Sequence, residues 1–342
     1  MKTKPFVLLA AVTAAVAAAV TPVILDAASV RIVQTNAAGD SVMLIDPATD
    51  KIVGEIQGIE VNHGAAAAPD GSRYYITNES ESTVDIVDGK TLKIIKKVPL
   101  TNHPNNIAIS KDGKRVYAAI VAGAGAIDVI DTATMTRVKS IRTEGGIHNT
   151  YVTPDGKFVV AGSIPGKKIT VIDQKTEEVL YTIPTDAGVR PICFETNPDG
   201  STKRMFVQLS DFHGFIAIDW NTKQVTERIK LPDVPEKERH TEGLQGSPSH
   251  GIGITPDGKT LWANSKMNSH IYAYSMPDLK FIAGVKVGEH PDWLTFTPDS
   301  KRVYVANAGS NSVSVVDIAA RKELSQIKVG QVPKRNITAV IP

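Results

Sequence analysis

Short runs of alternating apolar and polar residues recur along this chain at intervals of about forty residues. The last copy is the clearest. Trp293–Thr297 is rich in β-forming residues, Arg302–Asn307 and Ser312–Asp317 follow it, and Leu324–Val329 completes the set. Turn-forming residues such as Pro298-Asp299-Ser300 separate the runs. Each copy therefore predicts four short antiparallel strands, and no segment beyond the N-terminal stretch shows the sustained period of 3.6 residues that indicates a helix.

Four strands per repeat at this spacing are typical of a β-propeller blade. The copies predict six blades at residues 61–100, 101–143, 144–185, 186–231, 232–287 and 288–329. Residues 29–60 supply only three strands, and residues 336–341 at the other end of the chain supply the missing one. We therefore expect an all-β fold, a seven-bladed β-propeller with four antiparallel strands per blade, in which the C-terminal strand closes the first blade. Residues 29–342 form a single domain.

Two phrases point to a known family. Tyr-Ile-Thr-Asn at residues 75–78 and Tyr-Val-Ala-Asn at residues 304–307 follow Pro-Asp-Gly or Pro-Asp-Ser turns, and in this the chain resembles the YVTN-repeat family of seven-bladed propellers. The resemblance covers about residues 29–342, although residues 158–161 and 205–208 lack the Tyr and the Asn. It implies the fold and leaves the function open, because this architecture hosts binding proteins, lactonases, lyases and metal enzymes.

The N-terminus has a different composition. Lys2 and Lys4 precede an uncharged, Ala-rich run from Pro5 to Leu25, and Ala17–Ala19 offers a cleavage site, so residues 1–28 are interpreted as a secretory signal peptide. An uncleaved membrane anchor is the alternative. The single Cys193 excludes an internal disulfide bond. We expect a periplasmic or secreted protein, with the bacterial periplasm preferred.

The charge balance argues against a dedicated nucleic-acid binder. Cleavage after Ala19 removes Lys2 and Lys4 and no acidic residue, which leaves 36 basic and 36 acidic residues, whereas nucleic-acid binders show a basic excess or stripe. The chain also lacks a phosphate-binding glycine loop and a haem-attachment motif. We expect no nucleotide or haem cofactor, no nucleic-acid partner, no membrane contact beyond the signal segment, and a monomer.

A titratable residue recurs just before the innermost strand of six successive repeats. His63, His148 and His250 lie eight residues before the glycine of the turn that follows, and His103, Arg190 and His290 lie ten residues before the third residue of theirs. Side chains two positions apart on a strand point the same way, so the two groups predict two tiers around the axis. Both tiers belong to the near face, defined as the side of the wheel at which innermost strands begin; the Pro-Asp-Gly turns lie on the far face.

These residues support three hypotheses. In the first, His63, His148 and His250 bind a transition metal, copper or zinc, with Asp292 as a further ligand or support, and Arg190, His103 and His290 act on a small-molecule substrate. In the second, a metal-independent hydrolase, lactonase or lyase uses His as general base and Arg190 as anion partner. The third is a non-enzymatic scaffold that binds a small-molecule ligand or an envelope protein across the near face.

A purely structural role for the histidines, in which each bonds the backbone of the next blade, is the alternative to all three. The insertion at residues 232–249 is a candidate lid for the near face.

Overall fold

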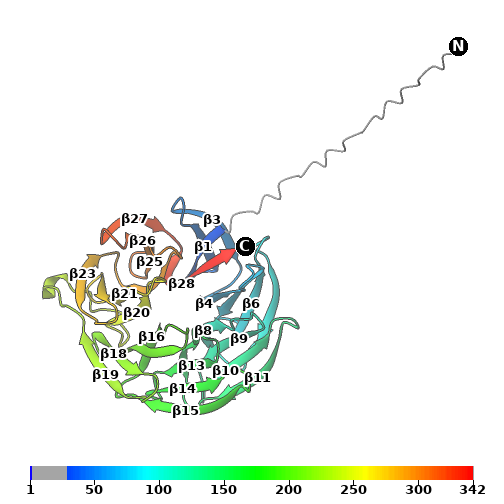
Figure 1. The fold of residues 1–342 in the computed structure, drawn as a ribbon, viewed down its shortest axis with the longest axis horizontal. Coiled ribbons are helices and arrows are strands. Elements are labelled where there is room, and N and C mark those ends of the chain that lie inside the picture. Colours follow the sequence, from blue (N-terminus) through cyan, green and yellow to red (C-terminus); the bar gives the residue numbers. More distant parts are fainter. Residues whose placement is uncertain (2–28, 342) are drawn as a thin grey trace.

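Seven four-stranded antiparallel sheets surround a central axis in the computed structural model (Figure 1), which describes Met1 and residues 29–341. The predicted fold class is confirmed. The predicted signal segment lies outside the described residues. Within residues 29–341, no helix is long and apolar enough to cross a membrane. The insertion contributes a single 3-10 turn, η1 (Glu236–Glu238).

The strands take the same four places in every blade. The innermost strands are β28 (Gln331–Ile341), β4 (Asn62–Ala67), β8 (Pro104–Ile109), β12 (Ile147–Val152), β16 (Val189–Thr196), β20 (Ser249–Ile254) and β24 (Pro291–Phe296). Next to them lie β1 (Ser29–Ala38), β5 (Arg73–Asn78), β9 (Arg115–Ile120), β13 (Phe158–Ser163), β17 (Thr202–Leu209), β21 (Thr260–Ser265) and β25 (Arg302–Asn307).

The third and fourth strands continue each blade outward. The third strands are β2 (Ser41–Asp46), β6 (Thr83–Asp88), β10 (Ala126–Asp131), β14 (Lys168–Asp173), β18 (Gly214–Asp219), β22 (His270–Ser275) and β26 (Ser312–Asp317). The outermost strands are β3 (Lys51–Gln57), β7 (Ile94–Pro99), β11 (Thr136–Arg142), β15 (Glu178–Pro184), β19 (Val225–Lys230), β23 (Phe281–Lys286) and β27 (Lys322–Lys328).

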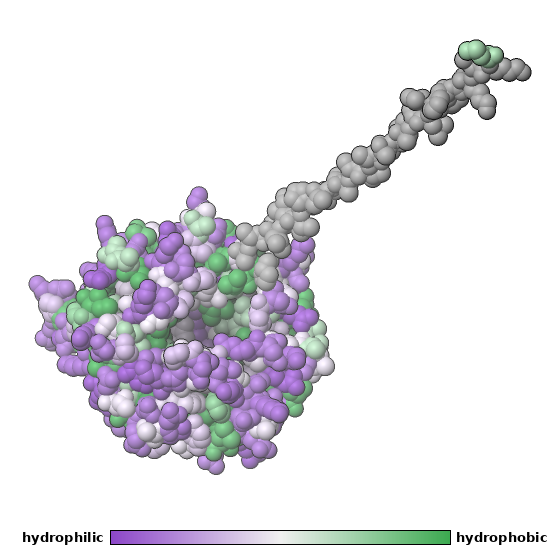
Figure 2. Space-filling model, in the orientation of Figure 1, coloured by the Kyte–Doolittle hydropathy of each residue, from purple (hydrophilic) through white to green (hydrophobic). Residues whose placement is uncertain are grey.

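The hydrophobic core lies between neighbouring blades. Leu44 of β2 packs in one cluster with Tyr74 and Ile76 of β5, so each sheet buries both of its faces against the sheets beside it. This explains why the second and third strands are buried in almost every position, whereas the outermost strands are largely exposed. The axis remains open, and Figure 2 shows a hollow at the centre of the wheel.

The ring closes by pairing of the two ends of the domain. β28 lies antiparallel to β1, with Ile337 opposite Val33 and Ala339 opposite Arg31. The buried Asn336 side chain also donates a hydrogen bond of 3.2 Å to the carbonyl of Tyr304 in the blade next along the ring. The predicted closing strand is confirmed, and it removes the free sheet edge that the three-stranded first blade would otherwise expose.

Every innermost strand carries one extra residue relative to its neighbour. Two registers identify it directly: His148 lies between the paired residues Ile147 and Asn149, and Asp292 between Pro291 and Trp293, with no partner of their own. The other five strands have the same irregularity at the same place. Such a β-bulge interrupts the alternation of side chains and turns the extra residue in a new direction. We call the seven residues at this position the hub ring: His63, Asn105, His148, Arg190, His250, Asp292 and Lys334.

The closing strand provides a test of how much ring closure stabilises the fold. Ala339 is buried and Val340, the next residue, is 44% exposed. We expect Ala339→Asp to lower the free energy of unfolding by about 3 kcal/mol or more, because the new carboxylate is buried without a partner. Val340→Asp is the matched control and changes stability by less than about 0.5 kcal/mol. Urea denaturation measures both, and equal losses for the two variants would contradict closure by burial on this strand.

Candidate functional site

All seven residues of the hub ring line one cavity of about 120 Å³ at the near face. The insertion covers it with Leu244, Gln245 and Ser247, and Lys266 enters from the loop after β21. The lid is anchored to the ring, because the Arg190 Nη2 donates a 2.8 Å hydrogen bond to the Gln245 carbonyl. The cavity is therefore small, polar and closed by a segment without regular strands or α-helix.

His250 and Asp292 form a directional hydrogen-bonded pair in this cavity. The His250 Nδ1 lies 2.9 Å from the Asp292 backbone oxygen and 3.6 Å from its carboxylate Oδ2. A carbonyl oxygen only accepts, so Nδ1 donates and the neutral ring carries its lone pair on Nε2. Burial holds the pKa of His250 well below its ordinary value of 6.5, against the opposing effect of Asp292, and the charge of Lys266 lowers it further. His250 is therefore neutral at pH 7 and able to accept a proton.

The other two predicted histidines have different surroundings. The His148 ring meets the His250 ring edge to face with centroids 5.7 Å apart, and burial, followed by the charge of Arg335, holds the pKa of His148 well below 6.5. The His63 Nδ1 forms a close ion-pair contact with Glu79. Burial lowers the pKa of His63 despite this contact. Two imidazoles from non-adjacent blades thus meet across the axis, while the third is engaged by a carboxylate.

Positive charge exceeds negative charge around the cavity. The Asp292 Oδ1 lies 2.9 Å from the Lys266 Nζ and 3.8 Å from the Lys334 Nζ. Burial alone would raise the pKa of Asp292, but the charges of Lys266 and Lys334 outweigh it and hold that pKa well below the usual range. Since Arg190 adds a third cation to the lining, the single carboxylate of Asp292 leaves a net positive field that favours an anionic ligand.

The two predicted tiers are not what the structure shows. Arg190, which the register placed in the other tier, shares the hub ring with the three histidines, and Ile192 lies further along the channel. The reason is the length of the hairpin. Because β16 and β17 have eight residues each, Arg190 lies ten residues before the glycine of its turn, whereas the three hub histidines lie eight residues before theirs. His103 and His290 do not line the cavity: the His103 Nε2 contacts Glu79 at 3.3 Å, and the His290 ring lies 6.0 Å from that of His240.

Sequence reasoning missed four charged residues of the hub. Lys266, Glu79 and Arg335 carry no repeat signal, because they come from loops or from the position after the bulge. Lys334 did carry one: it follows Asp292 by the same interval that separates Asp292 from His250. Its residue type differs from that of the hub histidines, although its position in the repeat is the same.

The metal hypothesis remains a prediction. Among the residues that the structure describes, there is no group of three or more His, Cys, Asp or Glu side chains placed to hold a metal ion. His148 and His250 are adjacent, but Asp292 is engaged by two lysines and His63 by Glu79.

The closed ring of seven blades around a polar cavity places the protein in the class of seven-bladed β-propellers. Comparison with known proteins leads to the same class. Residues 123–336 match the family described as "Lactonase, 7-bladed beta-propeller". The chain belongs to this family.

Solved structures share the fold. Kuenenia stuttgartiensis hydrazine synthase is 26% identical with a TM-score of 0.71, over 83% of this chain and 91% of that chain. A putative 6-phosphogluconolactonase from Bacteroides fragilis is 18% identical with a TM-score of 0.73, over 94% and 100%. The periplasmic gluconolactonase of Pseudomonas aeruginosa is 18% identical with a TM-score of 0.71, over 92% and 100%. At 18% identity these last two show the fold alone.

Curated relatives match a shorter segment. The Salmonella typhi protein named "Uncharacterized protein YncE" is 26% identical over 96 residues, which are 28% of this chain and only 27% of that relative. Together with the fold, this match supports the YVTN resemblance.

The buried neutral histidines predict how stability depends on pH. Because the pKa of His250 is lower in the folded than in the unfolded chain, acidification favours the unfolded chain, and stability falls once the pH drops below about 6.5. Each histidine that stays neutral in the folded chain lowers the free energy of unfolding by about 1.4 kcal/mol per pH unit in that range. We expect His250→Gln to show a shallower decline between about pH 6.5 and pH 5 than the wild type. Chemical denaturation at several pH values measures the slopes, and identical slopes would contradict the assignment.

Proposed function

We propose that the protein hydrolyses a small anionic lactone or ester at the near-face cavity. The observation that carries this proposal is the placement of His250, neutral and oriented by Asp292, beside the cations of the hub ring. A general base of this kind needs a free lone pair and a partner that stabilises its protonated form. The Asp292 carbonyl fixes the ring so that the lone pair is on Nε2, and the Asp292 carboxylate supplies the negative charge. The family match supports a lactonase, and the hydrolase was one of the three sequence hypotheses.

The reaction can be written on the residues present. A water molecule attacks the carbonyl carbon of the substrate while the His250 Nε2 removes its proton. The charge that develops on the carbonyl oxygen is stabilised by Lys334 or Arg190, and the same cations hold the anionic group of the substrate. The carbon–oxygen bond of the ring then breaks, and the leaving alkoxide takes the proton back from His250, so the product is an open-chain hydroxy acid.

Substrate entry requires the lid to move. The cavity of about 120 Å³ is smaller than the 300–1,000 Å³ typical of ligand pockets. The lid is held by a few hydrogen bonds, among them Arg190 to Gln245 and the Asp211 amide to the Gly246 carbonyl at 3.0 Å. Opening of residues 244–247 would enlarge the site and release Arg190 for the substrate. The signal-like N-terminus supports an envelope location for this activity.

Glucono-δ-lactone and its 6-phosphate are suitable probe substrates, because they differ only in the anionic group. We expect the wild-type protein to hydrolyse the phosphorylated lactone above the uncatalysed rate. The His250→Asn variant should lower kcat by about 10²- to 10⁴-fold. His270→Asn is the matched control, since that ring stacks on Tyr272 and lies outside the cavity lining.

The acid limb of the rate is a second readout of the same experiment. Because protonation inactivates the base, kcat/KM falls as the pH is lowered, and the midpoint lies below the ordinary histidine pKa of 6.5. A His250→Asn rate equal to wild type would reject the role of His250. Saturable binding of both lactones without turnover would instead favour the scaffold hypothesis.

Transition-metal binding is the second candidate function, favoured by the edge-to-face contact of His148 and His250. Zinc bound there would act as a Lewis acid, and copper as a Lewis acid or a redox centre. Elemental analysis of untagged protein tests it. We expect stoichiometric metal that is lost in His148→Ala if the hypothesis is correct. Metal-free protein with lactonase activity that survives a chelator would reject it.

A further inference from the structure

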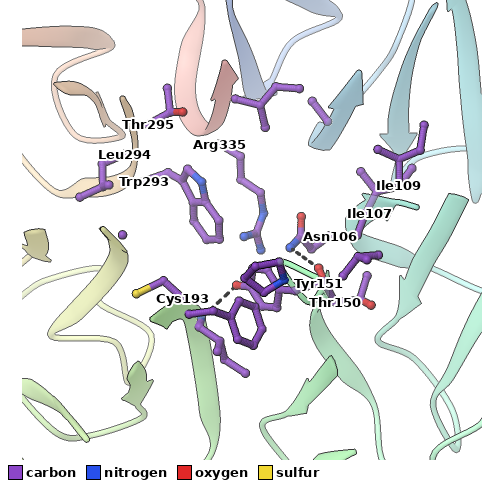
Figure 3. A pocket seen from close by; sticks show the side chains of 18 of the residues that line it. Asn106, Ile107, Ile109, Thr150, Tyr151, Cys193, Trp293, Leu294, Thr295 and Arg335 are labelled. Carbon is purple, nitrogen blue, oxygen red and sulfur yellow. Dashed lines mark hydrogen bonds between the residues drawn. The ribbon is translucent and has the colours of Figure 1, made fainter. Parts of the chain in front are cut away.

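A second cavity of about 420 Å³ occupies the axis on the other side of the hub ring. Its walls are mainly apolar, with Ile107, Ile109, Phe194, Leu294 and Phe296 as the larger side chains. Residues of the far-face turns, Lys111 and Pro154, also line it, so the cavity faces away from the lid. Figure 3 shows this channel from close by, with Arg335 and Trp293 extending into its centre. We call it the far channel; the proposed hydrolase site does not use it.

Arg335 is the only charged residue at the centre of this channel within the part of the chain that the structure describes. Its side chain is 1% exposed, and its guanidinium lies 4.2 Å from the centre of the Trp293 ring. The Nη2 donates a 2.6 Å hydrogen bond to the Asn105 Oδ1 of the hub ring. The Nε and Nη1 are buried and have no hydrogen-bond partner among residues 29–341, and no carboxylate there forms an ion pair with this residue.

An unpartnered cation in this position needs an explanation. Burial lowers the pKa of Arg335 to about 10, so the group is still charged at neutral pH. Asp292 and Glu79 act on Arg335 only through space and form no ion pair with it. A buried charge that lacks a direct counter-charge is unfavourable, and unsatisfied buried donors are rare in folded proteins. The neighbouring hub residue Lys334 is itself cationic and gives no compensation. A ligand that brings one negative charge to this point would remove the deficit.

We infer that the far channel binds an organic carboxylate with an apolar body, whose carboxylate accepts hydrogen bonds from Arg335 and whose body lies along Trp293 and the aliphatic walls. An apolar pocket with one well-placed polar group is the usual form of a small-molecule site, and about 420 Å³ is within the usual range. A dianionic phosphate fits less well, because Arg335 is the one cation at the centre of the channel among the described residues, and Lys111 lies at the far-face end. This inference goes beyond the proposed hydrolase and involves the opposite side of the hub ring.

Octanoate and octanol form the decisive probe pair, since they share the apolar chain and differ in charge. We expect saturable binding of octanoate to the full-length protein by isothermal titration calorimetry, and much weaker binding of octanol. Arg335→Met keeps an unbranched, flexible side chain and removes the charge, and should weaken octanoate binding by about 10- to 100-fold. Quenching or enhancement of tryptophan fluorescence on binding should disappear in Trp293→Phe, while Trp220 and Trp262 still report on folding.

A second variant keeps the test decisive if Arg335→Met does not fold. Ile109 is only partly buried at the edge of a core cluster, so Ile109→Glu places a carboxylate in the channel wall at a smaller cost in stability than a change at a fully buried residue. It should weaken octanoate binding by at least about tenfold. Val138→Glu is its matched control, because Val138 is 52% exposed on the outermost strand of the same blade. Equal binding of octanoate and octanol, octanoate affinity unchanged in Ile109→Glu or Arg335→Met, or no saturable binding at millimolar octanoate would each overturn the inference. Octanoate binding that persists in His250→Asn separates this site from the proposed hydrolase.

Discussion

The candidate site of this protein depends on one backbone irregularity that is repeated in all seven innermost strands. A single extra residue at the near-face end of each strand turns one side chain per blade toward the axis. Close approach of the blades makes this effective. A β-carbon on Gly64 would lie 2.8 Å from the Asn105 carbonyl oxygen, and one on Gly251 would lie 2.9 Å from the Trp293 α-carbon. The hub is consequently narrow enough for His148 and His250 to touch across it.

The hub ring combines residues of different charge, which a strictly symmetric repeat would not. Its seven positions hold three imidazoles, two cations, one carboxylate and one amide. Burial keeps the pKa values of His148 and His250 low, and Lys266 and Lys334 keep Asp292 ionised. The consequence is a neutral base next to a positive field, with Arg335 behind it in an apolar channel. Two cavities of opposite character thus meet at one ring of residues.

Membership of the lactonase propeller family does not by itself determine chemistry, because the same wheel carries many functions. Blade packing and closure place demands on the apolar residues between sheets, and these demands are independent of what stands at the hub. The seven bulge positions are therefore free to vary in residue type. The proposed function assigns specificity to their occupants and to the lid at residues 232–249.

The repeat pattern alone predicted the number of blades, the strand order and closure by residues 336–341, because strand alternation and turn chemistry are local properties. It also placed His63, His148 and His250 at one level, since they share one register with their turns. Only the tertiary structure decided the rest. The longer hairpin of β16 and β17 moved Arg190 into the same ring, and Lys266, Glu79 and Arg335 reached the hub from positions with no repeat signal. Burial and the meeting of distant charges set the protonation of the site, and neither quantity exists until the ring has closed.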